Sequence, residues 1–496
     1  MTRRYGLSKS KFVAGVQCHR MLWWRVHEPD APELAVDDGL QRVFDTGHAV
    51  GVAAQRFFGE GKLIELDLRD VPRAIDETRA AIEAGETTIF EAAFSEDGVF
   101  AAVDILSKDG DSWVITEVKS TTRVKDQFIP DVALQAHVVE SAGLSVVRAE
   151  VMHLNSAHRH PDNGPLFIRS DVTETITDWR SQVPQETEVQ RNMLAGPLPT
   201  VEPGPHCKKP YECDFFGRCN KKPPVHSVAE LYRITDKGVA KWHQKGIELI
   251  ADIPAGAKLN AIHDRQRRAL QTSQPIVEDG LAQALDKYRF PIAMFDYETV
   301  TMALPIWNGT GPFEQIPVQY SIHLLGEDGS VEHREYLADG GGDPREGLAR
   351  SLVKDLGEAG SIVAWSAVFE LQRTGALAEY AREALGDESL AGELNRIAGA
   401  IEDLLPVVRD HLYHPAFHGS FSLKSVVPAL LPELSYDDLD VGDGGTAAGL
   451  LADLLLRPET IEDAAKVRGD LLAYCRRDTE VMVEIFRVLR GMAEEA

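Results

Sequence analysis

The sequence lacks the long apolar segments that membrane-spanning and secreted proteins need. No run of about 18 apolar residues occurs in the chain, and the N-terminal stretch "MTRRYGLSKSKF" contains basic residues but no apolar core. A transmembrane helix or a signal peptide would require such a core. We therefore expect no membrane segment and a cytoplasmic location.

Positive charge is also scarce. The 496 residues contain 52 Lys and Arg against 78 Asp and Glu, which gives a net charge of −26. Such a chain disfavours sequence-independent binding to phosphates unless local basic stretches or metal ions mediate it. The stretches "RRYGLSKSK", "CHRMLWWR" and "HDRQRRAL" are candidates, although each is equally well explained as a solvated face. No P-loop or helicase motif occurs, so unwinding of a duplex would require a helicase partner.

Cysteine is too rare for a disulfide framework. Five cysteines occur in the whole chain, and three of them crowd into the segment 207–219, among prolines and lysines. Clustered cysteines in a cytoplasmic protein indicate metal binding rather than disulfides. The remaining composition, 44% hydrophobic and 26% charged, is that of a soluble globular protein with more than one domain.

The order of sequence patterns predicts an α/β protein in three parts. Residues 1–225 mix helical and strand patterns and end in the loop-rich stretch "PTVEPGPHCKKPYECDFFGRCNKKPP". Residues 226–285 have an amphipathic helical pattern, and we interpret them as a connector. Residues 286–496 begin with the strand pattern "FPIAMFDYETV" and end with a long helical pattern.

The first candidate site lies in the stretch "VFAAVDILSKDGDSWVITEVKS", which predicts two strands joined by a tight turn. Glu117 and Lys119 share a strand face because they are two residues apart, and a loop of even length places Asp104 on that face too. Two carboxylates can bind Mg²⁺ or Mn²⁺, and a neighbouring lysine can help to orient or deprotonate water. The alternative is a surface hairpin with an ion pair.

This stretch, followed by the helix pattern "PDVALQAHVVESAG", resembles the PD-(D/E)xK nuclease core in its RecB-like form. The resemblance implies metal ligands at Asp104 and Glu117, a catalytic lysine at Lys119 and a further active-site residue at Gln135. It also implies a histidine ligand on an earlier helix, at a spacing that falls near Gly51. His48, in "DTGHAVGVAAQRFF", is therefore expected to be a helical surface histidine.

The second candidate site is formed by cysteines. Cys207, Cys213 and Cys219 leave a tetrahedral site one ligand short, and Cys18 can supply the fourth thiolate. Such a site would connect distant parts of the first domain and restrict the unfolded chain. Unrelated buried cysteines are the alternative, and we expect this for Cys475.

One early cysteine and three late ones around a RecB-like core are similar to the iron–sulfur RecB-like nucleases. The resemblance implies a [4Fe–4S] cluster, whereas four thiolates alone would suit Zn²⁺ equally well. The late cysteines of that family are commonly spaced C-x2-C-x5-C, and this chain has C-x5-C-x5-C instead.

The third candidate site begins in "FDYETV". Asp296 and Glu298 share a strand face, and Tyr474 and Asp478 share a helical face in "YCRRD". Glu370 ends the pattern "IVAWSAVFE", which predicts a buried strand that runs into a turn and a helix. Carboxylates from separate elements could hold two Mg²⁺ or Mn²⁺ ions. The alternative is exposed carboxylates on an edge strand.

These motifs resemble the DEDD exonucleases of the RNase H-like fold, in the subclass with a tyrosine in the last motif. The resemblance places Asp296 and Glu298 in the first motif and Glu370 in the second. It places Tyr474 and Asp478 in the third. The second motif departs from the family pattern, which favours asparagine and ends in aspartate, so Asp403 is a second candidate carboxylate.

Nearly the whole chain resembles a bacterial family of uncharacterised proteins that joins these two halves, with "MHLN" and "FHGSFSLKSVVPALLPELSYDDLDVGDG" as typical segments. The implied architecture is a PD-(D/E)xK domain and an RNase H-like mixed-sheet domain joined by the helical connector. We expect a metal-dependent nuclease, acting on single-stranded DNA ends in repair or defence, with RNA as another substrate. The alternative is a non-catalytic or single-site scaffold that binds nucleic acid beside a helicase.

Overall fold

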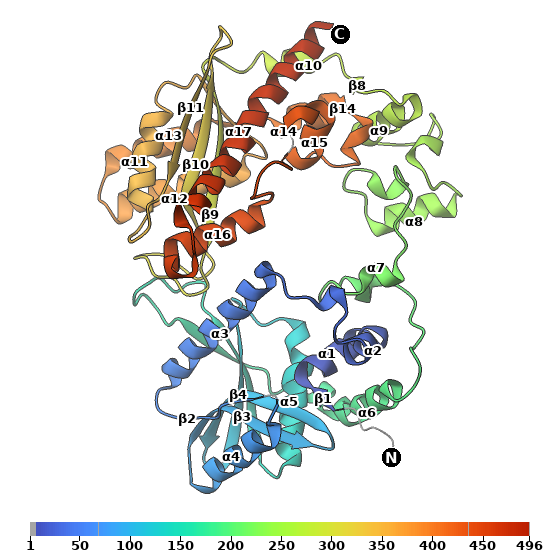
Figure 1. The fold of residues 1–496 in the computed structure, drawn as a ribbon, viewed down its shortest axis with the longest axis vertical. Helices are drawn as coiled ribbons and strands as arrows, with labels where there is room; N and C mark the ends of the chain where they lie inside the picture. Colours follow the sequence, from blue (N-terminus) through green and yellow to red (C-terminus); the bar gives the residue numbers. More distant parts are fainter. Residues whose placement is uncertain (1–5, 68, 435, 496) are drawn as a thin grey trace. The chain divides into compact units, whose positions relative to one another are not determined.

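The computed structural model describes residues 6–67, 69–434 and 436–495. The chain folds into two compact units (Figure 1). Unit 1 contains Met1–Lys222 and Met302–Glu314, and unit 2 contains Pro223–Thr301 and Gln315–Ala496. Both units mix helices and strands, so the protein belongs to the α/β class.

Unit 1 is built on a mixed seven-stranded sheet with the order β2-β3-β4-β5-β6-β7, in which β1 pairs with β4. The pairs β3/β4, β4/β5 and β6/β7 are antiparallel, and β1/β4, β2/β3 and β5/β6 are parallel. The strands are β1 (Leu7–Ser8), β2 (Lys62–Leu63), β3 (Thr88–Glu96), β4 (Val99–Asp109), β5 (Ser112–Lys119), β6 (Val146–Leu154) and β7 (Phe167–Asp171).

The helices of unit 1 surround this sheet, and α5 is almost entirely buried against it. They are α1 (Lys9–Gln17), α2 (His19–His27), α3 (Asp38–Phe58), α4 (Val71–Glu83), α5 (Ile129–Ser141), α6 (Thr177–Leu194) and the short α7 (Phe216–Cys219). The structure confirms the predicted hairpin of β4 and β5, with Gly110 at a φ of 60° in the turn. It also confirms the following helix, with Pro130 in its first turn.

Unit 2 is built on a five-stranded sheet with the order β11-β10-β9-β12-β13. The pairs β9/β10 and β10/β11 are antiparallel, whereas β9/β12 and β12/β13 are parallel. A separate small sheet pairs β8 with β14. The strands are β8 (Ile276–Val277), β9 (Ile292–Thr301), β10 (Gln315–Leu325), β11 (Val331–Leu337), β12 (Ser361–Ala364), β13 (Ile401–Asp403) and β14 (Leu412–Tyr413).

The helices of unit 2 include the predicted long C-terminal helix, α17. They are α8 (Asp236–Gln244), α9 (Ala261–Thr272), α10 (Leu281–Leu285), α11 (Arg345–Asp355), α12 (Val368–Glu383), α13 (Glu388–Ala400), α14 (Leu405–His411), α15 (Leu423–Leu430), α16 (Gly444–Leu456) and α17 (Ala464–Glu495). In the part of the chain that the structure describes, no helix has both the length and the apolar character needed to cross a membrane.

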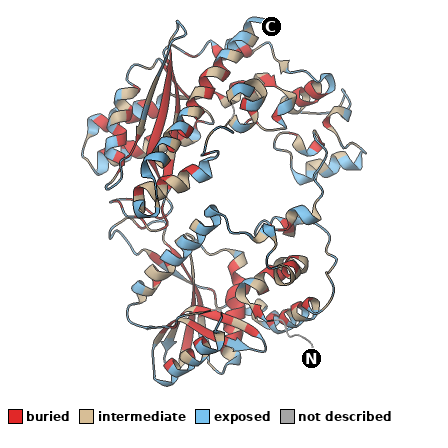
Figure 2. Cartoon of the chain, viewed as in Figure 1, coloured by how far each residue is buried: buried red, intermediate tan, exposed pale blue. Residues whose placement is uncertain are grey.

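Strand β9 separates the two layers of the unit 2 core. Ile292 and Met294 pack with α17, whereas Ala293, Phe295 and Tyr297 pack with α11, α12 and α13 on the other face. Figure 2 shows the central strands of this sheet mostly in the colour of buried residues, in agreement with the burial of β9, β10 and β12. Since alternate residues of a strand share a face, the next even-numbered residues of β9 also face α17.

The segment 302–314 is part of unit 1, although unit 2 strands flank it on both sides. Ala303 and Leu304 join a small apolar core that contains Val50 of α3. The main chain at Gly309 and Thr310 forms two hydrogen bonds with His160, of 2.8 and 2.9 Å. The segment is therefore held by side-chain packing and by main-chain hydrogen bonds.

Candidate active sites and cysteine cluster

The first candidate site forms where an apolar strand face becomes charged. Trp113 and Ile115 of β5 pack in the core that includes α5, and Glu117 and Lys119 continue the same face. Gln135 of α5 lies opposite this end of the strand and is fully buried. The alternation of β5 therefore directs both predicted charged residues toward the helix that carries the predicted glutamine.

Glu117 is the centre of the hydrogen-bond network in this site. Its carboxylate accepts hydrogen bonds from Lys119 Nζ at 2.6 Å, Gln135 Nε2 at 2.7 Å and Lys9 Nζ at 3.0 Å. Burial opposes the charge of Glu117, but the two lysines and the glutamine outweigh it and hold its pKa well below the usual range. Glu117 is therefore ionised at neutral pH although it is only 4% exposed.

Asp104 lies beside Glu117 and is not fully compensated. Its Oδ2 accepts a hydrogen bond from the Val118 main-chain N–H at 2.7 Å, and its Oδ1 lies 3.5 Å from Lys9 Nζ. Burial and the charge of Glu117 raise the pKa of Asp104 to about 7. A further cation in this site would restore the ionised form of Asp104.

Three residues of this site were not predicted. Asp131 Oδ2 accepts a hydrogen bond from Lys119 Nζ at 3.0 Å, and Asp131 is one turn before Gln135 on α5, a spacing that the sequence does reveal. Lys9 comes from α1, more than 100 residues away, and no local pattern indicates it. Glu91 of β3 faces Asp104, and burial raises its pKa.

Two pockets open onto these side chains. One, of about 760 Å³, is lined by Lys9, Glu91, Glu117 and Lys119. The other, of about 660 Å³, is lined by Asp104 and Glu91 together with His48. His48 is on α3 and exposed, as expected, but it faces the same pocket as the two carboxylates.

The donor set of the first site fits a hard divalent cation. Its candidate ligands are carboxylate oxygens, which Mg²⁺ and Mn²⁺ prefer, and one of them has a raised pKa that a cation would lower. The Lys9 ammonium contacts both Asp104 and Glu117, at the position where a cation has to balance their charges. Lys9 thus stands in for a cation between the two carboxylates.

Replacement of Lys9 by methionine tests this interpretation. Removal of a cation that competes for the two carboxylates should tighten Mn²⁺ binding about fivefold, since a partly buried ion pair contributes about 1 kcal/mol. Calorimetric titration of the purified chain with Mn²⁺ measures the change. Lys11→Met on the same helix is the control, and weaker binding in Lys9→Met would show that Lys9 positions the ligands.

The third candidate site lies between β9 and α17 in unit 2. Asp296 and Glu298 continue the face of β9 that packs on α17, and Asp478 comes from that helix. One carboxylate oxygen from each of these three residues lies within 4.8 Å of the others. Both residue pairs that the sequence spacing predicted to share a face therefore do so, and the two faces meet.

Glu370, in the first turn of α12, lines the same pocket but is not one of the three residues whose oxygens lie within 4.8 Å of one another. It is 3% exposed, and its Oε2 atom is buried without a hydrogen-bond partner. Burial raises the pKa of Glu370 to about 7, that of Glu298 to about 8 and that of Asp478 to about 6. Burial and the neighbouring carboxylates raise the pKa of Asp296 well above its usual range.

Two tyrosines lie beside Asp478. Tyr436, which was not predicted, donates a hydrogen bond of 2.6 Å from its hydroxyl group to Asp478 Oδ1. Its ring centroid lies 6.2 Å from that of Tyr474, which is one helical turn before Asp478. No spacing rule connects Tyr436 with α17, so its place in the site could not be predicted from the sequence. Both rings stand beside the carboxylates, and Tyr474 also lines their pocket.

Asp403, the second candidate carboxylate, has a different role. Its Oδ1 accepts hydrogen bonds from the main-chain N–H groups of Ser366 at 2.9 Å and Leu405 at 3.0 Å. Ser366 has a φ of 65°, and Asp403 holds this left-handed turn just before α12. Asp403 therefore fixes the turn that leads to Glu370, and Glu370 points into the pocket.

The donor set of this third site, in unit 2, also fits divalent cations. Its pocket, of about 520 Å³, is lined by Asp296, Glu298, Glu370 and Asp478. Among the described residues, no lysine or arginine forms an ion pair with Asp296, Glu298 or Glu370. Buried carboxylates without a cation are costly, and an oxygen-ligated Mg²⁺ or Mn²⁺ would remove this cost.

The four predicted cysteines line one pocket in unit 1. Cys18 lies between α1 and α2, and Cys207, Cys213 and Cys219 come from the loop that includes α7. Burial raises the pKa of Cys213 to about 11, so its thiol is protonated unless a metal binds it. Cys475 is completely buried in α17 of unit 2, as predicted.

The sulfur atoms of these four cysteines line the pocket but do not all lie close to one another. Among the described residues, no three of these cysteine sulfurs lie within 4.8 Å of one another. A tetrahedral zinc ion with bonds of about 2.3 Å would draw its sulfurs to about 3.8 Å apart. A [4Fe–4S] cluster holds the sulfurs farther apart, because each binds a different iron. The four thiols can supply the ligands of either group.

Two comparisons found similarity to known proteins over part of the chain. A family model described as a domain of unknown function (DUF2779) matches residues 293–422, a range that includes Asp296, Glu298 and Glu370. No curated protein matches the chain. Among solved structures, an alkaline exonuclease (LHK-Exo) from Laribacter hongkongensis is 14% identical and covers 38% of this chain and 89% of its own, with a TM-score of 0.17.

Proposed function

We propose that the protein is a metal-dependent nuclease that hydrolyses phosphodiester bonds, with single-stranded DNA ends as its substrate. The observation that carries the proposal is that the carboxylates of Asp296, Glu298, Glu370 and Asp478 line one pocket. Among the described residues, none of the first three forms an ion pair with a lysine or arginine. Such clusters occur where divalent ions act on phosphate esters. The Asp104 and Glu117 site, with its lysine, supports the same chemistry in unit 1.

In unit 1, we assign Asp104 and Glu117 as metal ligands in a PD-(D/E)xK site. A bound Mg²⁺ or Mn²⁺ would supply an activated water and charge stabilisation at the phosphate. Lys119 is held by Glu117 and Asp131, and these charges outweigh burial and keep its pKa above the usual range. Lys119 therefore acts as a cation beside the phosphate. Gln135 holds the Glu117 carboxylate in place by a hydrogen bond from its Nε2 atom.

In unit 2, we assign Asp296, Glu298, Glu370 and Asp478 as ligands of a DEDD-type site on an RNase H-like sheet. The protein's own contribution is to hold these carboxylates on a rigid strand and two helices. Tyr474 lines the same pocket and can orient a water molecule with its hydroxyl group. Tyr436 holds the Oδ1 atom of Asp478 by a hydrogen bond and so orients this carboxylate.

We propose that the four cysteines hold a [4Fe–4S] cluster as a structural connection. The cluster would join Cys18, at the end of α1, to the loop that contains the other three cysteines. Since Lys9 is on that same helix, the connection would also fix one wall of the unit 1 site.

The proposal is tested by degradation of end-labelled single-stranded DNA and RNA in Mg²⁺ or Mn²⁺, with protein purified without oxygen. We expect Asp104→Asn and Asp296→Asn each to remove the activity of one unit and the double variant to be inactive. Asp109→Asn on β4 and Glu379→Gln on α12 are controls on the same elements. Absence of cleavage by the wild type with an intact cluster, or persistent cleavage by the double variant, would contradict the proposal.

Lys119→Met should lower kcat in unit 1 about 100-fold, because it removes a buried cation beside the proposed phosphate position. Its effect on KM should be small, since the ligands for the metal remain. Steady-state kinetics in the Asp296→Asn background isolates this unit. Lys125→Met, on the loop that follows β5, is the control, and an equal loss in both variants would refute the assigned role.

A further inference from the structure

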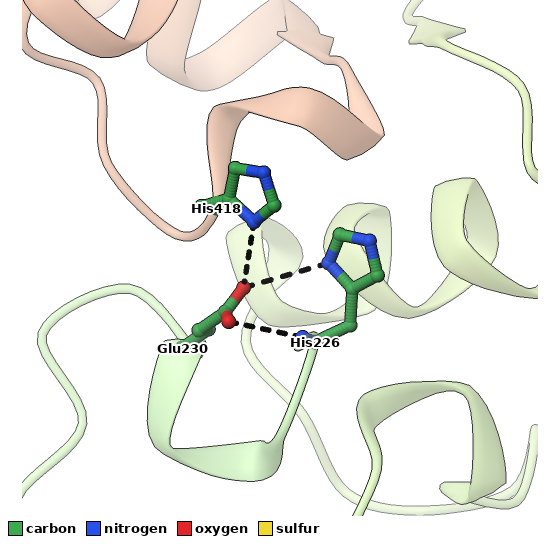
Figure 3. A group of neighbouring side chains, drawn as sticks. All are labelled: His226, Glu230 and His418. Carbon is green, nitrogen blue, oxygen red and sulfur yellow. Dashed lines mark hydrogen bonds and ion pairs between the residues drawn. The ribbon is translucent and has the colours of Figure 1, made fainter. Parts of the chain in front are cut away.

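A third group of potential ligands lies in unit 2, away from both carboxylate sites. His226, Glu230 and His418 come from two segments that are distant in sequence, and their side chains converge (Figure 3). Glu230 Oε2 lies 3.4 Å from His226 Nδ1 and 3.4 Å from His418 Nδ1. All three donor atoms lie within 4.8 Å of one another.

Ordinary hydrogen bonding does not account for this arrangement. His226 Nδ1 and Glu230 Oε2 are both buried and have no hydrogen-bond partner. The other oxygen, Oε1, is occupied by the His226 main-chain N–H at 2.9 Å, which leaves Oε2 directed at the two rings. Buried polar atoms without partners are rare and costly, and a shared ligand between them would satisfy both.

The distances match a small transition-metal ion. With metal–nitrogen and metal–oxygen bonds of about 2.1 Å, a tetrahedral site places its donors about 3.4 Å apart. The two imidazole rings are nearly parallel, with an interplanar angle of 6° and centroids 5.0 Å apart. Two charged imidazolium rings would repel at this distance, whereas two neutral rings can bind a metal through Nδ1.

We propose that His226, Glu230 and His418 form a binding site for a divalent transition-metal ion, of which Zn²⁺ is the representative. Two imidazoles and one carboxylate suit Zn²⁺ rather than Mg²⁺, which prefers oxygen ligands alone. Three protein ligands leave a fourth position for water.

The proposed ion would clamp two segments that form a wall of the Asp296 pocket. The residues after Glu230 include Tyr232 and Arg233, and those after His418 include Phe421, and all three line that pocket. The two segments already meet closely, since a side chain at Gly419 would lie 1.8 Å from the Glu230 carbonyl oxygen. An ion at this junction would hold the wall without entering the pocket.

Zinc content of the full chain tests the site. Protein treated with chelator is dialysed against Zn²⁺ and its zinc is counted per chain by mass spectrometry. The other sites contribute equally to all variants, so differences report this site. We expect His418→Ala and Glu230→Gln each to lose one zinc equivalent, and His243→Ala, an exposed histidine of α8, to lose none.

Two features keep the test decisive. His418 has a side chain that is 55% exposed, so its removal should leave the fold intact, and glutamine at 230 can still accept the His226 N–H. Amide exchange across residues 226–233 and 418–424 should slow with Zn²⁺ in the wild type and remain unchanged in His418→Ala. Wild-type zinc content and wild-type protection in both variants would overturn the proposal.

Discussion

Asp296→Asn should abolish cleavage by unit 2 and at the same time stabilise the chain in the presence of chelator. The variant removes a metal ligand, for which we expect a loss of roughly 1000-fold in kcat. It also removes a buried carboxyl group whose pKa burial and the neighbouring carboxylates raise, and with it the cost of keeping that group protonated in the folded chain. Each kcal/mol by which the substitution raises the free energy of unfolding should raise the Tm by about 2–4 °C.

The stabilisation should depend on pH with a defined sign. Burial raises the pKa of Glu298 to about 8, that of Glu370 to about 7 and that of Asp478 to about 6, and neighbouring carboxylates add to the shift of Glu298 and Glu370. All three values lie above those of the unfolded chain. The folded chain therefore binds more protons, and the stability present below about pH 4 is lost as the pH rises toward 8. Chelated wild type should have a lower Tm at pH 8 than at pH 5, and Asp296→Asn should reduce this difference.

The measurement is thermal unfolding by calorimetry, with and without Mn²⁺. Manganese should raise the Tm of the wild type at pH 8 far more than that of Asp296→Asn, because only the wild type keeps the full ligand set. Glu379→Gln on α12 is the matched control and should behave as the wild type does. A variant less stable than the wild type in chelator at pH 8 would show that the carboxylates are stabilised in another way.

Cys213→Ser should remove the iron–sulfur cluster and destabilise unit 1 strongly. A cluster that joins Cys18 to Cys207 closes a loop of about 190 residues in the unfolded chain. Loop closure of this length contributes about 5 kcal/mol in the chain-entropy description. The raised pKa of Cys213 also means that its thiolate exists only with bound metal.

Iron and sulfide content together with urea unfolding measure this effect. The variant should lose its iron, and its unfolding midpoint should fall, when both proteins are purified without oxygen. Cys475→Ala is the control, because Cys475 is buried in the other unit and should leave the iron content unchanged. If wild-type protein prepared in this way contains zinc instead of iron, the four cysteines bind a single zinc ion and not a cluster.

Local spacing in the sequence predicted much of both carboxylate sites. The alternation of β9 and β5 is enough to place Asp296 with Glu298 and Glu117 with Lys119, and the helical repeat places Tyr474 with Asp478. These relations depend on the backbone geometry of one element, which short-range sequence patterns determine.

Contacts between distant elements were not predictable in this way. Lys9 reaches Glu117 from a helix at the start of the chain, and Tyr436 reaches Asp478 from a loop. The sequence also left the choice between Glu370 and Asp403 open. It depends on a left-handed turn at Ser366 that ties up Asp403, and only the three-dimensional structure reveals this turn.

The segment 302–314 limits how this protein can be divided. The chain passes between its two units at residues 222–223, 301–302 and 314–315, so a proteolytic cut at 301–302 or 314–315 leaves residues 1–222 covalently joined to part of unit 2. A fragment that ends at residue 222 would lack Ala303 and Leu304, and it would expose the apolar surface that they cover. Modular exchange of either half between relatives would therefore require three crossover points, at 222–223, 301–302 and 314–315, rather than a single junction.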